Sequence, residues 1–354
     1  MALTPAGVNE LVNAGHVVVV QAGAGVGSAI DDADYRAAGA TVSTVDDAWG
    51  AELVVKVKEP IPAEFSRLRA DQILFTYLHL AANEPLVNAL VAAGTTSIAY
   101  ETVQLPDGLL PLLAPMSEVA GRLSVLVGAY HLMGSQGGRG VLLPGVPGVR
   151  PATVTIIGAG TAGQNALSQA VAMGADVTVL DLSIPRLRQI DALYAGRVHT
   201  VVSNAYEIER AARGSDLVIG AVLVPGRKAP TLVSRELVSR MRRGSVLVDI
   251  AIDQGGCFAD SHPTTHDDPV YDVEGSIFYC VANMPGAVAV TSTYALTNAT
   301  LPYVVEIADL GWRAAVAQDP ALAGGLSTVD GYVVHKETSE LFPQFPSRPA
   351  LAAA

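Results

Sequence analysis

The sequence predicts an α/β protein made of two Rossmann-like, doubly wound domains with parallel sheets and a cleft between the domains. Short apolar runs typical of buried strands alternate with segments of helical period along nearly the whole chain. One of these runs leads into a glycine-spaced turn that opens a helical segment. The chain has 354 residues, 50% of them hydrophobic, which is enough for two separate cores.

The first domain is predicted over residues 1–114, and residues 290–354 are expected to return to it. Thr4 is placed to cap a helix that has Pro5 at its first position and ends near Gly15. Further helical segments are predicted over 31–39, up to Arg69 and over 83–94, and the predicted strands are HVVVVQ, TVSTV, LVVKVK, QILFTYL and TSIAYE. We expect this discontinuous unit to be the substrate domain.

The second domain is predicted over residues 115–289 and begins with a connecting helix over 117–133. A glycine- and proline-rich stretch, GSQGGRGVLLPGVPGVRP, then leads into a repeated alternation of strands and helices. The predicted strands are TVTIIG, DVTVLD, VHTVV, DLVIGAV, SVLVDIA and IFYCVAN. A long helical segment over 292–312 follows, and the cleft between the two domains is the expected place for chemistry.

The turn after TVTII predicts a dinucleotide site, because Gly158, Gly160 and Gly163 have the GxGxxG spacing. The first glycine permits a tight turn, the second lets the backbone approach a pyrophosphate, and the third lets helix and strand pack closely. The helix N-terminus then attracts the phosphates. Glycine-rich turns also occur in α/β proteins that bind no nucleotide, so the spacing by itself leaves a purely structural role open.

The next predicted strand strengthens the dinucleotide interpretation. It ends at Asp181, about twenty residues after the turn, where a carboxylate binds the ribose hydroxyls of NAD. A carboxylate at this place repels the 2′-phosphate of NADP, which favours NAD. Arg186 and Arg188 follow closely enough to keep NADP open as an alternative.

Three side chains are candidates for the chemistry. Lys58 ends a predicted strand and His79 follows another, at the edge where open α/β sheets bind ligands. Asp253 follows the strand expected beside the nicotinamide, where a carboxylate can stabilise a cation, and histidine exchanges protons near neutral pH. Plainer interpretations stay open as well. Lys58 can be a solvated strand end like Lys56, which shares its face, while His79 can be a core histidine and Asp253 a turn cap.

Composition narrows the class of protein. The formal charge of −12 and the lack of any basic run argue against nucleic-acid binding, and the apolar runs are too short or interrupted to cross a membrane. Only Cys257 and Cys280 are present and no secretory leader precedes Ala2, so we expect a cytoplasmic protein. We predict no metal site, and interpret one acidic, histidine-bearing loop, ADSHPTTHDDP, as solvent-facing.

Ten segments of the sequence together indicate a family resemblance that the periodicity of helices and strands does not reveal. They are PAGV, KVKEP, FTYLHLA, SIAYETVQ, PLLAPMSEVAGR, QGGRGVLLPGVPGV, IGAGTAG, DIAIDQGGCF, YCVANMPGAV and TSTYALTNATLPY. With these segments the chain closely resembles the L-alanine dehydrogenases of the alanine dehydrogenase and pyridine nucleotide transhydrogenase family, over nearly its whole length. The resemblance implies an oxidoreductase that interconverts L-alanine with pyruvate and ammonia using NAD, and it implies a homohexamer.

The same resemblance implies roles for matching residues. Lys58 is implied to bind the substrate carboxylate and carbonyl, His79 to donate or accept the proton, and Asp253 to be the second catalytic group. Besides Gly158, Gly160 and Gly163, the implied cofactor contacts are Ser117, Thr161, Asp181, Arg186, Ser203, Val222, Leu223, Ile250, Asp253, Val281, Ala282, Asn283 and Met284.

One departure from the family pattern concerns the start of the chain. In the family, a leading strand and a loop ending in a carboxylate-binding arginine precede the segment that matches ALTPAGV. We therefore expect the first strand of the substrate domain to be missing here and substrate binding to be weaker. Two further interpretations remain, a catalytically impaired NAD-binding truncation product and the NAD-binding component of a transhydrogenase.

Overall fold

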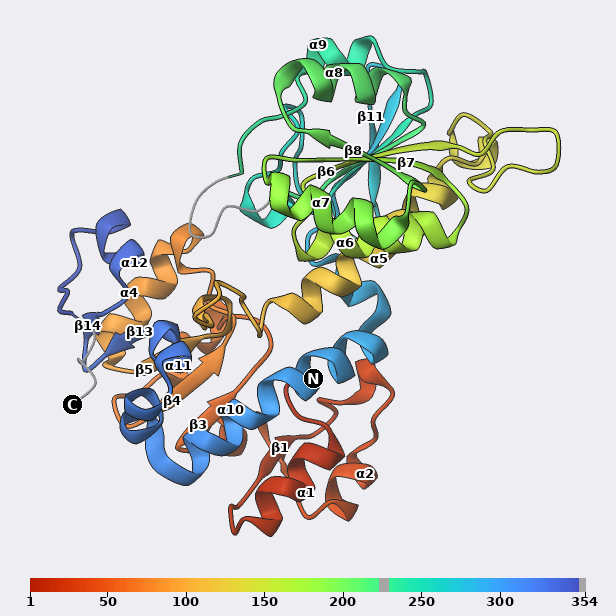
Figure 1. Ribbon diagram of the computed structural model, residues 1–354. Helices are drawn as coiled ribbons and strands as arrows, with labels where there is room; N and C mark the ends of the chain where they lie inside the picture. Colours follow the sequence, from red (N-terminus) through yellow and green to blue (C-terminus); the bar gives the residue numbers. More distant parts are fainter. Residues whose placement is uncertain (223–228, 350–354) are drawn as a thin grey trace. The chain divides into compact units, whose positions relative to one another are not determined.

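The computed structural model describes residues 1–222 and 229–349, which fall into two compact units (Figure 1). The first unit comprises Met1–Pro115 and the chain from Val288 onward, and the second comprises Met116–Ala287. Both are built of helices and mainly parallel strands, which confirms the predicted α/β class. No helix in the described ranges is both long and apolar enough to cross a bilayer.

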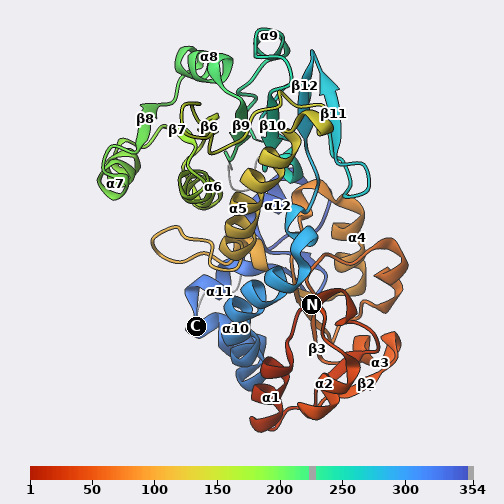
Figure 2. The same cartoon turned by 90° about the vertical axis from the view of Figure 1, so that its right-hand side faces the viewer.

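The second unit is built on a seven-stranded sheet with the order β11-β12-β10-β9-β6-β7-β8, which can be followed across Figure 2. The strands are β6 Thr153–Ile157, β7 Asp176–Asp181, β8 Val198–Val202, β9 Leu217–Gly220, β10 Val246–Asp249, β11 Val270–Val273 and β12 Ser276–Tyr279. Neighbours pair in parallel except β11, which runs antiparallel to β12 at the edge. The strand order reverses its direction of travel at β6, as a doubly wound sheet requires.

Helices cover both faces of this sheet, with α8 and α9 on one side and α5 and α6 on the other (Figure 1). The helices are α5 Ala114–His131, α6 Thr161–Ala172, α7 Ile184–Tyr194, α8 Ala205–Gly214 and α9 Arg235–Ser239, with 3-10 turns η5 Gly134–Gln136, η6 Ile252–Gln254 and η7 Met284–Val288. The central strands read as nearly continuous apolar runs because they are buried on both faces.

The first unit contains a five-stranded sheet of order β14-β13-β5-β4-β3 and a separate parallel pair, β1-β2. The strands are β1 Val19–Gln21, β2 Thr41–Ser43, β3 Leu53–Val55, β4 Ile73–Thr76, β5 Thr96–Ala99, β13 Leu326–Val329 and β14 Tyr332–Val333. β3, β4 and β5 are parallel, whereas β13 runs antiparallel to β5 and to β14. Leu74, Leu78 and Leu90 lie in the buried core beside this sheet.

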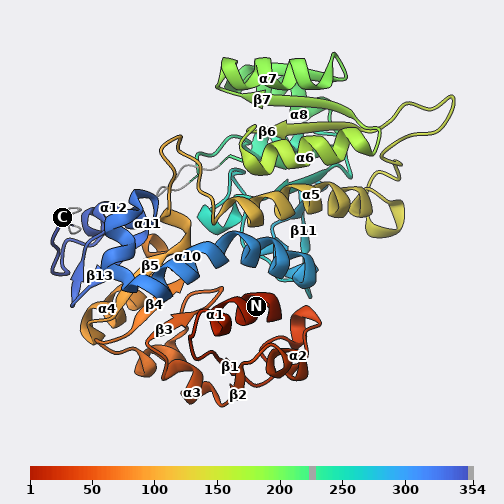
Figure 3. The ribbon, with the colours of Figure 1, turned by 60° about the horizontal axis from the view of Figure 1, so that its bottom comes forward.

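The helices of the first unit include those predicted near the start of the chain, over 31–39, over 83–94 and over 292–312, whereas α3, α11 and α12 were not predicted and the helix expected up to Arg69 is the 3-10 turn η2. Figure 3 shows α1 to α3 around the β1-β2 pair. They are α1 Pro5–Asn13, α2 Asp32–Ala37, α3 Val45–Trp49, α4 Glu84–Ala93, α10 Ala289–Gln318, α11 Pro320–Gly325 and α12 Lys336–Leu341, with 3-10 turns η1 Val26–Ser28, η2 Pro62–Arg67, η3 Leu80–Ala82 and η4 Tyr100–Thr102. Thr4 caps α1 by accepting a hydrogen bond from the Gly7 N–H, which confirms the predicted helix start.

Several local predictions were wrong for identifiable reasons. The run TVSTV holds a strand only to Ser43, because Thr44 and Asp47 form a capping box that starts α3. LVVKVK is a strand only to Val55, so Lys58 lies in a bend beyond the strand end and does not terminate it. The predicted 292–312 helix is longer, and Gly311 breaks it with a φ of 72°.

Candidate active site

The β6–α6 turn of the second unit is packed as tightly as its glycine spacing requires. Gly158 has a φ of +97°, and a Cβ at Gly163 would lie 1.8 Å from the Gly158 carbonyl oxygen. By contrast, a Cβ at Gly160 would meet no atom within 4 Å. The first and third glycines therefore close the turn on itself, while the second faces open space in which a pyrophosphate can approach the backbone and the α6 N-terminus.

Asp181, at the end of β7, is fixed against this turn. Its Oδ2 accepts a hydrogen bond of 2.7 Å from the Ala159 N–H, and its Oδ1 accepts one of 2.8 Å from the Ser183 N–H. The Arg186 guanidinium lies 3.8 Å from Oδ2. Because a carboxylate offers about four acceptor positions, the two backbone bonds leave room for ribose hydroxyl groups.

The other residues assigned to the cofactor follow the carboxyl ends of neighbouring parallel strands. Such strand ends meet at one edge of a sheet, at the point where the strand order reverses, and this is where open α/β sheets bind ligands. Along this edge lie Thr161 after β6, Ser203 after β8, Val222 after β9, Ile250 and Asp253 after β10, and Val281, Ala282, Asn283 and Met284 after β12. Leu223, also assigned to the cofactor, lies outside the described residues.

Ser117 comes from a helix and not from a strand end. It lies in the first turns of α5, one turn before Gly121 on the same helix face. A Cβ at Gly121 would lie 2.2 Å from the Ala162 carbonyl oxygen, so the backbone of α5 presses against the beginning of α6. This close packing places Ser117 on the face of α5 that is turned toward α6, which begins at the dinucleotide turn.

The loop that carries Asp253 is organised by a buried carboxylate, Asp249. The Asp249 side chain is 0% exposed and accepts hydrogen bonds from the N–H groups of Ala251, Cys257 and Phe258, at 3.1, 2.8 and 3.3 Å. Ser261 Oγ donates a further bond of 2.5 Å. Burial raises the pKa of Asp249, although these hydrogen bonds oppose the shift.

Asp253 itself presents a free carboxylate. It sits in the 3-10 turn η6, its side chain is exposed, and it forms no hydrogen bond or ion pair with other described residues. Because Asp249 closes the loop on both sides of this turn, Asp253 is displayed on a fixed segment. It is not serving as the turn cap that its sequence context left open.

In the first unit, Lys58 and His79 follow β3 and β4, which are adjacent parallel strands, and so lie at the same sheet edge. The Thr76 hydroxyl donates a 3.1 Å hydrogen bond to the Lys58 carbonyl, which fixes the bend. Lys58 is exposed, and its ammonium group pairs with no described acid. The neighbouring Lys56 differs, because its ammonium group forms an ion pair of 2.5 Å with Glu64.

His79 adopts a left-handed backbone conformation, with φ 49° and ψ 40°. Its ring is part-buried, lies 5.8 Å from the Tyr77 ring in a stacked arrangement, and makes no hydrogen bond with a described residue. The imidazole nitrogens are therefore available to a substrate or a water. The Glu101 carboxylate, which follows β5, accepts hydrogen bonds from the backbone N–H groups of His79 and Leu78.

Two residues of these sites were not singled out from the sequence. Glu101 and Asp249 both lie inside segments that resemble the family, SIAYETVQ and DIAIDQGGCF, but the sequence pattern predicts a role for neither. Their common signal is an acidic residue at the end of a buried strand, a place where a carboxylate needs hydrogen-bond donors. The path of the following loop decides which hydrogen-bond donors reach the carboxylate. The sequence pattern does not predict that path.

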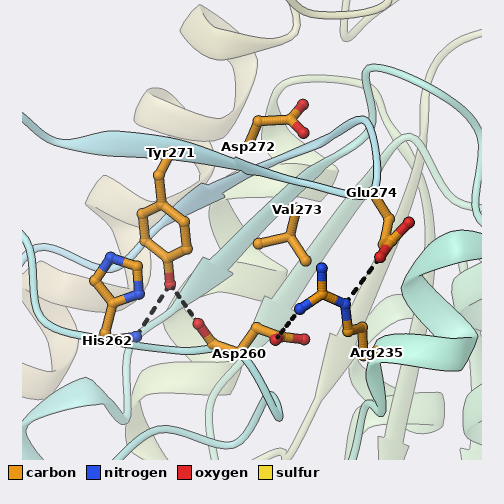
Figure 4. Close-up of a pocket in the computed structure, with 7 residues that line it drawn as sticks. All are labelled: Arg235, Asp260, His262, Tyr271, Asp272, Val273 and Glu274. Atoms are coloured by element: carbon orange, nitrogen blue, oxygen red, sulfur yellow. Dashed lines mark hydrogen bonds and ion pairs between the residues drawn. The ribbon is translucent and has the colours of Figure 1, made fainter.

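The acidic loop ADSHPTTHDDP contributes to a surface hollow of about 470 Å³ along the edge strand β11 (Figure 4). Arg235 pairs there with Asp260 and Glu274, and the His262 ring stacks on Tyr271 at 3.7 Å. His266 lies elsewhere in the loop, 3.3 Å from the Asn283 carbonyl oxygen. The described residues bring together no group of three or more side chains suited to a metal ion.

Two family models match the chain in succession, "Alanine dehydrogenase/PNT, N-terminal domain" over residues 1–120 and "Alanine dehydrogenase/PNT, C-terminal domain" over residues 124–336. The chain belongs to the alanine dehydrogenase/PNT family. It is 64% identical to "Alanine dehydrogenase" of Mycobacterium tuberculosis over 96% of this chain and 92% of that protein. It is also 58% identical to "Alanine dehydrogenase" of Halomonas elongata, over 97% of this chain and 93% of that one.

Solved structures of the alanine dehydrogenase/PNT family agree with this assignment. A structure titled "L-alanine dehydrogenase" matches with a TM-score of 0.93 and 52% identity, covering 97% of this chain and 95% of that one. A transhydrogenase from Sinorhizobium meliloti matches with a TM-score of 0.81 and 27% identity, covering 94% and 95%. The resemblance inferred from the ten segments is therefore confirmed, and the dehydrogenase branch is favoured over the transhydrogenase branch.

Proposed function

We propose that this protein catalyses the NAD-dependent, reversible oxidative deamination of L-alanine to pyruvate and ammonia. The observation that carries the proposal is the 64% identity, over 96% of the chain, to a relative named alanine dehydrogenase. The chemistry of the positions assigned to catalysis supports this activity, because the side chains of Lys58, His79 and Asp253 are exposed or part-buried and form no hydrogen bond or ion pair with described residues. The alternative roles, a transhydrogenase component and an impaired truncation product, are less well supported.

The residues around the β6–α6 turn fit NAD. The open space over Gly160 suits the pyrophosphate, and the remaining acceptor positions of Asp181 suit the ribose hydroxyls. The Arg186 guanidinium pairs with the Asp181 carboxylate, so the positive charge of Arg186 is partly neutralised. The site therefore favours the cofactor without a 2′-phosphate. When bound, NAD supplies the acceptor for the hydride that leaves the alanine Cα.

The chain's own residues bind the substrate and handle the protons. Lys58, which has no internal partner, binds the alanine carboxylate through a charge-assisted hydrogen bond. Once the alanine ammonium group has lost a proton to solvent, loss of hydride from Cα leaves a cationic imine, and the Asp253 carboxylate stabilises that positive charge. His79 takes a proton from the water that attacks the imine carbon and returns it to the amine of the resulting carbinolamine. Ammonia then departs, and the hydroxyl proton is released to solvent as pyruvate forms.

His79→Asn tests this proposal, because asparagine tolerates the left-handed backbone that His79 adopts but cannot act as a base near neutral pH. We expect kcat for alanine oxidation to fall about 100-fold or more, since general acid–base catalysis contributes at least that much. The dissociation constant for NADH, measured by fluorescence titration, should stay unchanged. An unaltered kcat would remove His79 from the mechanism.

We further infer that the enzyme works as a homohexamer in the cytoplasm. Leu126, Tyr130 and Met133, near the end of α5, are 47, 49 and 46% exposed, and contact with another copy would cover them. Both cysteines are free and buried, as suits a reducing compartment. Light scattering on the purified protein and fractionation of the producing cells test these two inferences.

A further inference from the structure

We propose that Glu101 is a positioning residue for His79, acting on its backbone and not on its ring. This inference rests on the proposed function, which makes His79 the proton-transfer group. The Glu101 Oε1 accepts hydrogen bonds from both the His79 N–H, at 2.7 Å, and the Leu78 N–H, at 3.1 Å. Its Oε2 lies 3.2 Å from the Leu78 N–H. Two consecutive backbone donors thus converge on one carboxylate.

These bonds fix the peptide group that leads into His79. A residue with a Cβ rarely adopts positive φ, and such a residue persists only where its surroundings impose it. The positive φ of His79 sets the direction in which its Cβ leaves the backbone, so the place of the ring depends on where the His79 amide is held. The carboxylate of Glu101 holds that amide on one side, and on the other side the His79 carbonyl accepts a 3.1 Å hydrogen bond from the Ala82 N–H.

Glu101 is held rigidly enough to fix the position of the His79 amide. Its neighbour Tyr100 is fully buried and packs edge-on against the rings of Phe75 and Tyr77, at 4.4 and 5.1 Å between centroids. The Tyr77 hydroxyl is anchored in turn by a 2.6 Å hydrogen bond to the Leu112 carbonyl. These aromatic contacts fix β4 and β5 relative to each other at the edge where His79 and Glu101 lie.

No competing cation draws the carboxylate away. Glu101 forms no ion pair with a lysine or arginine among the described residues. Burial raises the pKa of Tyr77 and the charge of Glu101 adds to that shift, whereas burial lowers the pKa of His335 and the charge of Glu101 opposes it. The backbone donors of Leu78 and His79 are the hydrogen-bond partners of the Glu101 carboxylate among the described residues, and losing the carboxylate would free the His79 amide to shift.

Two substitutions separate the hydrogen bonds from the charge. In Glu101→Gln, the amide oxygen can replace Oε1 and still accept from both N–H groups, so kcat should stay within about tenfold of the wild type. In Glu101→Met, a side chain of similar length accepts nothing, and kcat should fall about 100-fold, as expected when a catalytic group shifts by about 1 Å. The NADH dissociation constant should change in neither variant. Glu10→Met is the matched control, because Glu10 is an exposed residue of the same unit.

The contact can also be observed without any turnover. The chain has seven histidines, so labelling histidine with 15N gives at most seven backbone amide signals in the NMR spectrum. The His79 amide proton should lie far downfield in the wild type, remain downfield in Glu101→Gln and move upfield in Glu101→Met. This measurement tests the hydrogen bond from the His79 N–H to Glu101 even if the Glu101→Met variant folds poorly, because it can be made on the wild type and on Glu101→Gln alone.

Either of two results would overturn the inference, namely a Glu101→Met variant as active as Glu10→Met, or a Glu101→Gln variant as impaired as Glu101→Met. A His79 amide signal of ordinary shift in the wild type would overturn it too. Failure of the proposed function looks different, since the wild type would then form no NADH from alanine while the amide signals still reported the contact.

Discussion

The three glycines of the β6–α6 turn allow a prediction in which neighbouring, chemically identical substitutions have different consequences. A Cβ at Gly163 would lie 1.8 Å from the Gly158 carbonyl oxygen, whereas a Cβ at Gly160 would touch nothing within 4 Å. Gly160→Ala should therefore leave folding intact, and Gly163→Ala should not. Both variants should bind NADH less tightly, but for different reasons.

The magnitudes follow from these contacts. Heavy atoms in contact are separated by roughly 3.5 Å, so Gly163→Ala must push the start of α6 away from the turn by more than about 1 Å. Overpacking of this kind lowers the free energy of unfolding by about 3 kcal/mol or more. At Gly160 the φ of −69° suits alanine, so the free energy of unfolding should change by less than about 1 kcal/mol. The added methyl group there would occupy space needed by the pyrophosphate, which costs about 1–3 kcal/mol of NADH binding, or roughly 5- to 150-fold in Kd.

Urea unfolding and NADH fluorescence titration, carried out on both variants and the wild type, measure the two quantities separately. A Gly160→Ala variant that is stable and binds NADH as tightly as the wild type would refute the reasoning, because the pyrophosphate could not then lie over Gly160. A Gly163→Ala variant of wild-type stability would show that the turn is not closed as described.

Two further predictions concern charged side chains. Lys58→Met should raise KM for alanine by about 10- to 100-fold, because one charge-assisted hydrogen bond is lost. Lys56→Met, which removes the ion pair with Glu64 and the cation–π contact with the Trp49 ring, should leave KM unchanged and lower the free energy of unfolding, measured with urea, by about 1–2 kcal/mol. Asp249→Asn should lower the free energy of unfolding by about 1–3 kcal/mol, because an amide cannot accept from all the donors around this buried group. Since burial raises the pKa of Asp249 in the folded protein, the folded state binds its proton more tightly than the unfolded chain, and the wild type loses stability as pH rises from 3.8 through that raised pKa. The stability difference between wild type and Asp249→Asn should therefore be larger at pH 4.5 than at pH 7, and a difference that grows with pH would contradict this reasoning.

The elements that periodicity predicts well are those whose signals are local. Thr4 and Pro5 mark the start of α1, Asn83 and Gly94 bound α4, and the glycine spacing marks the β6–α6 turn, because caps and turns depend on a few neighbouring residues. The antiparallel strands β11, β13 and β14 were not predicted. β13 pairs with β5 across more than 200 residues of sequence, and no local pattern encodes such a pairing.

The same division holds for the candidate site. Lys58 and His79 could be selected because residues after parallel strands share one sheet edge. The partners that orient them could not be selected in this way. The contact of Glu101 with the His79 backbone joins two loops that follow different strands, and no local pattern of the sequence predicts it. Asp249 likewise binds donors spread over a loop whose path is set by tertiary packing.

The most direct test of the account supplies the purified protein with NAD and L-alanine carrying deuterium at Cα. We predict that NADH and pyruvate form in equal amounts, that ammonia is released with them, and that the deuterium appears in the reduced cofactor. NADH formation without transfer of the deuterium, or no alanine-dependent NADH at all from protein that binds the cofactor, would contradict the central claim.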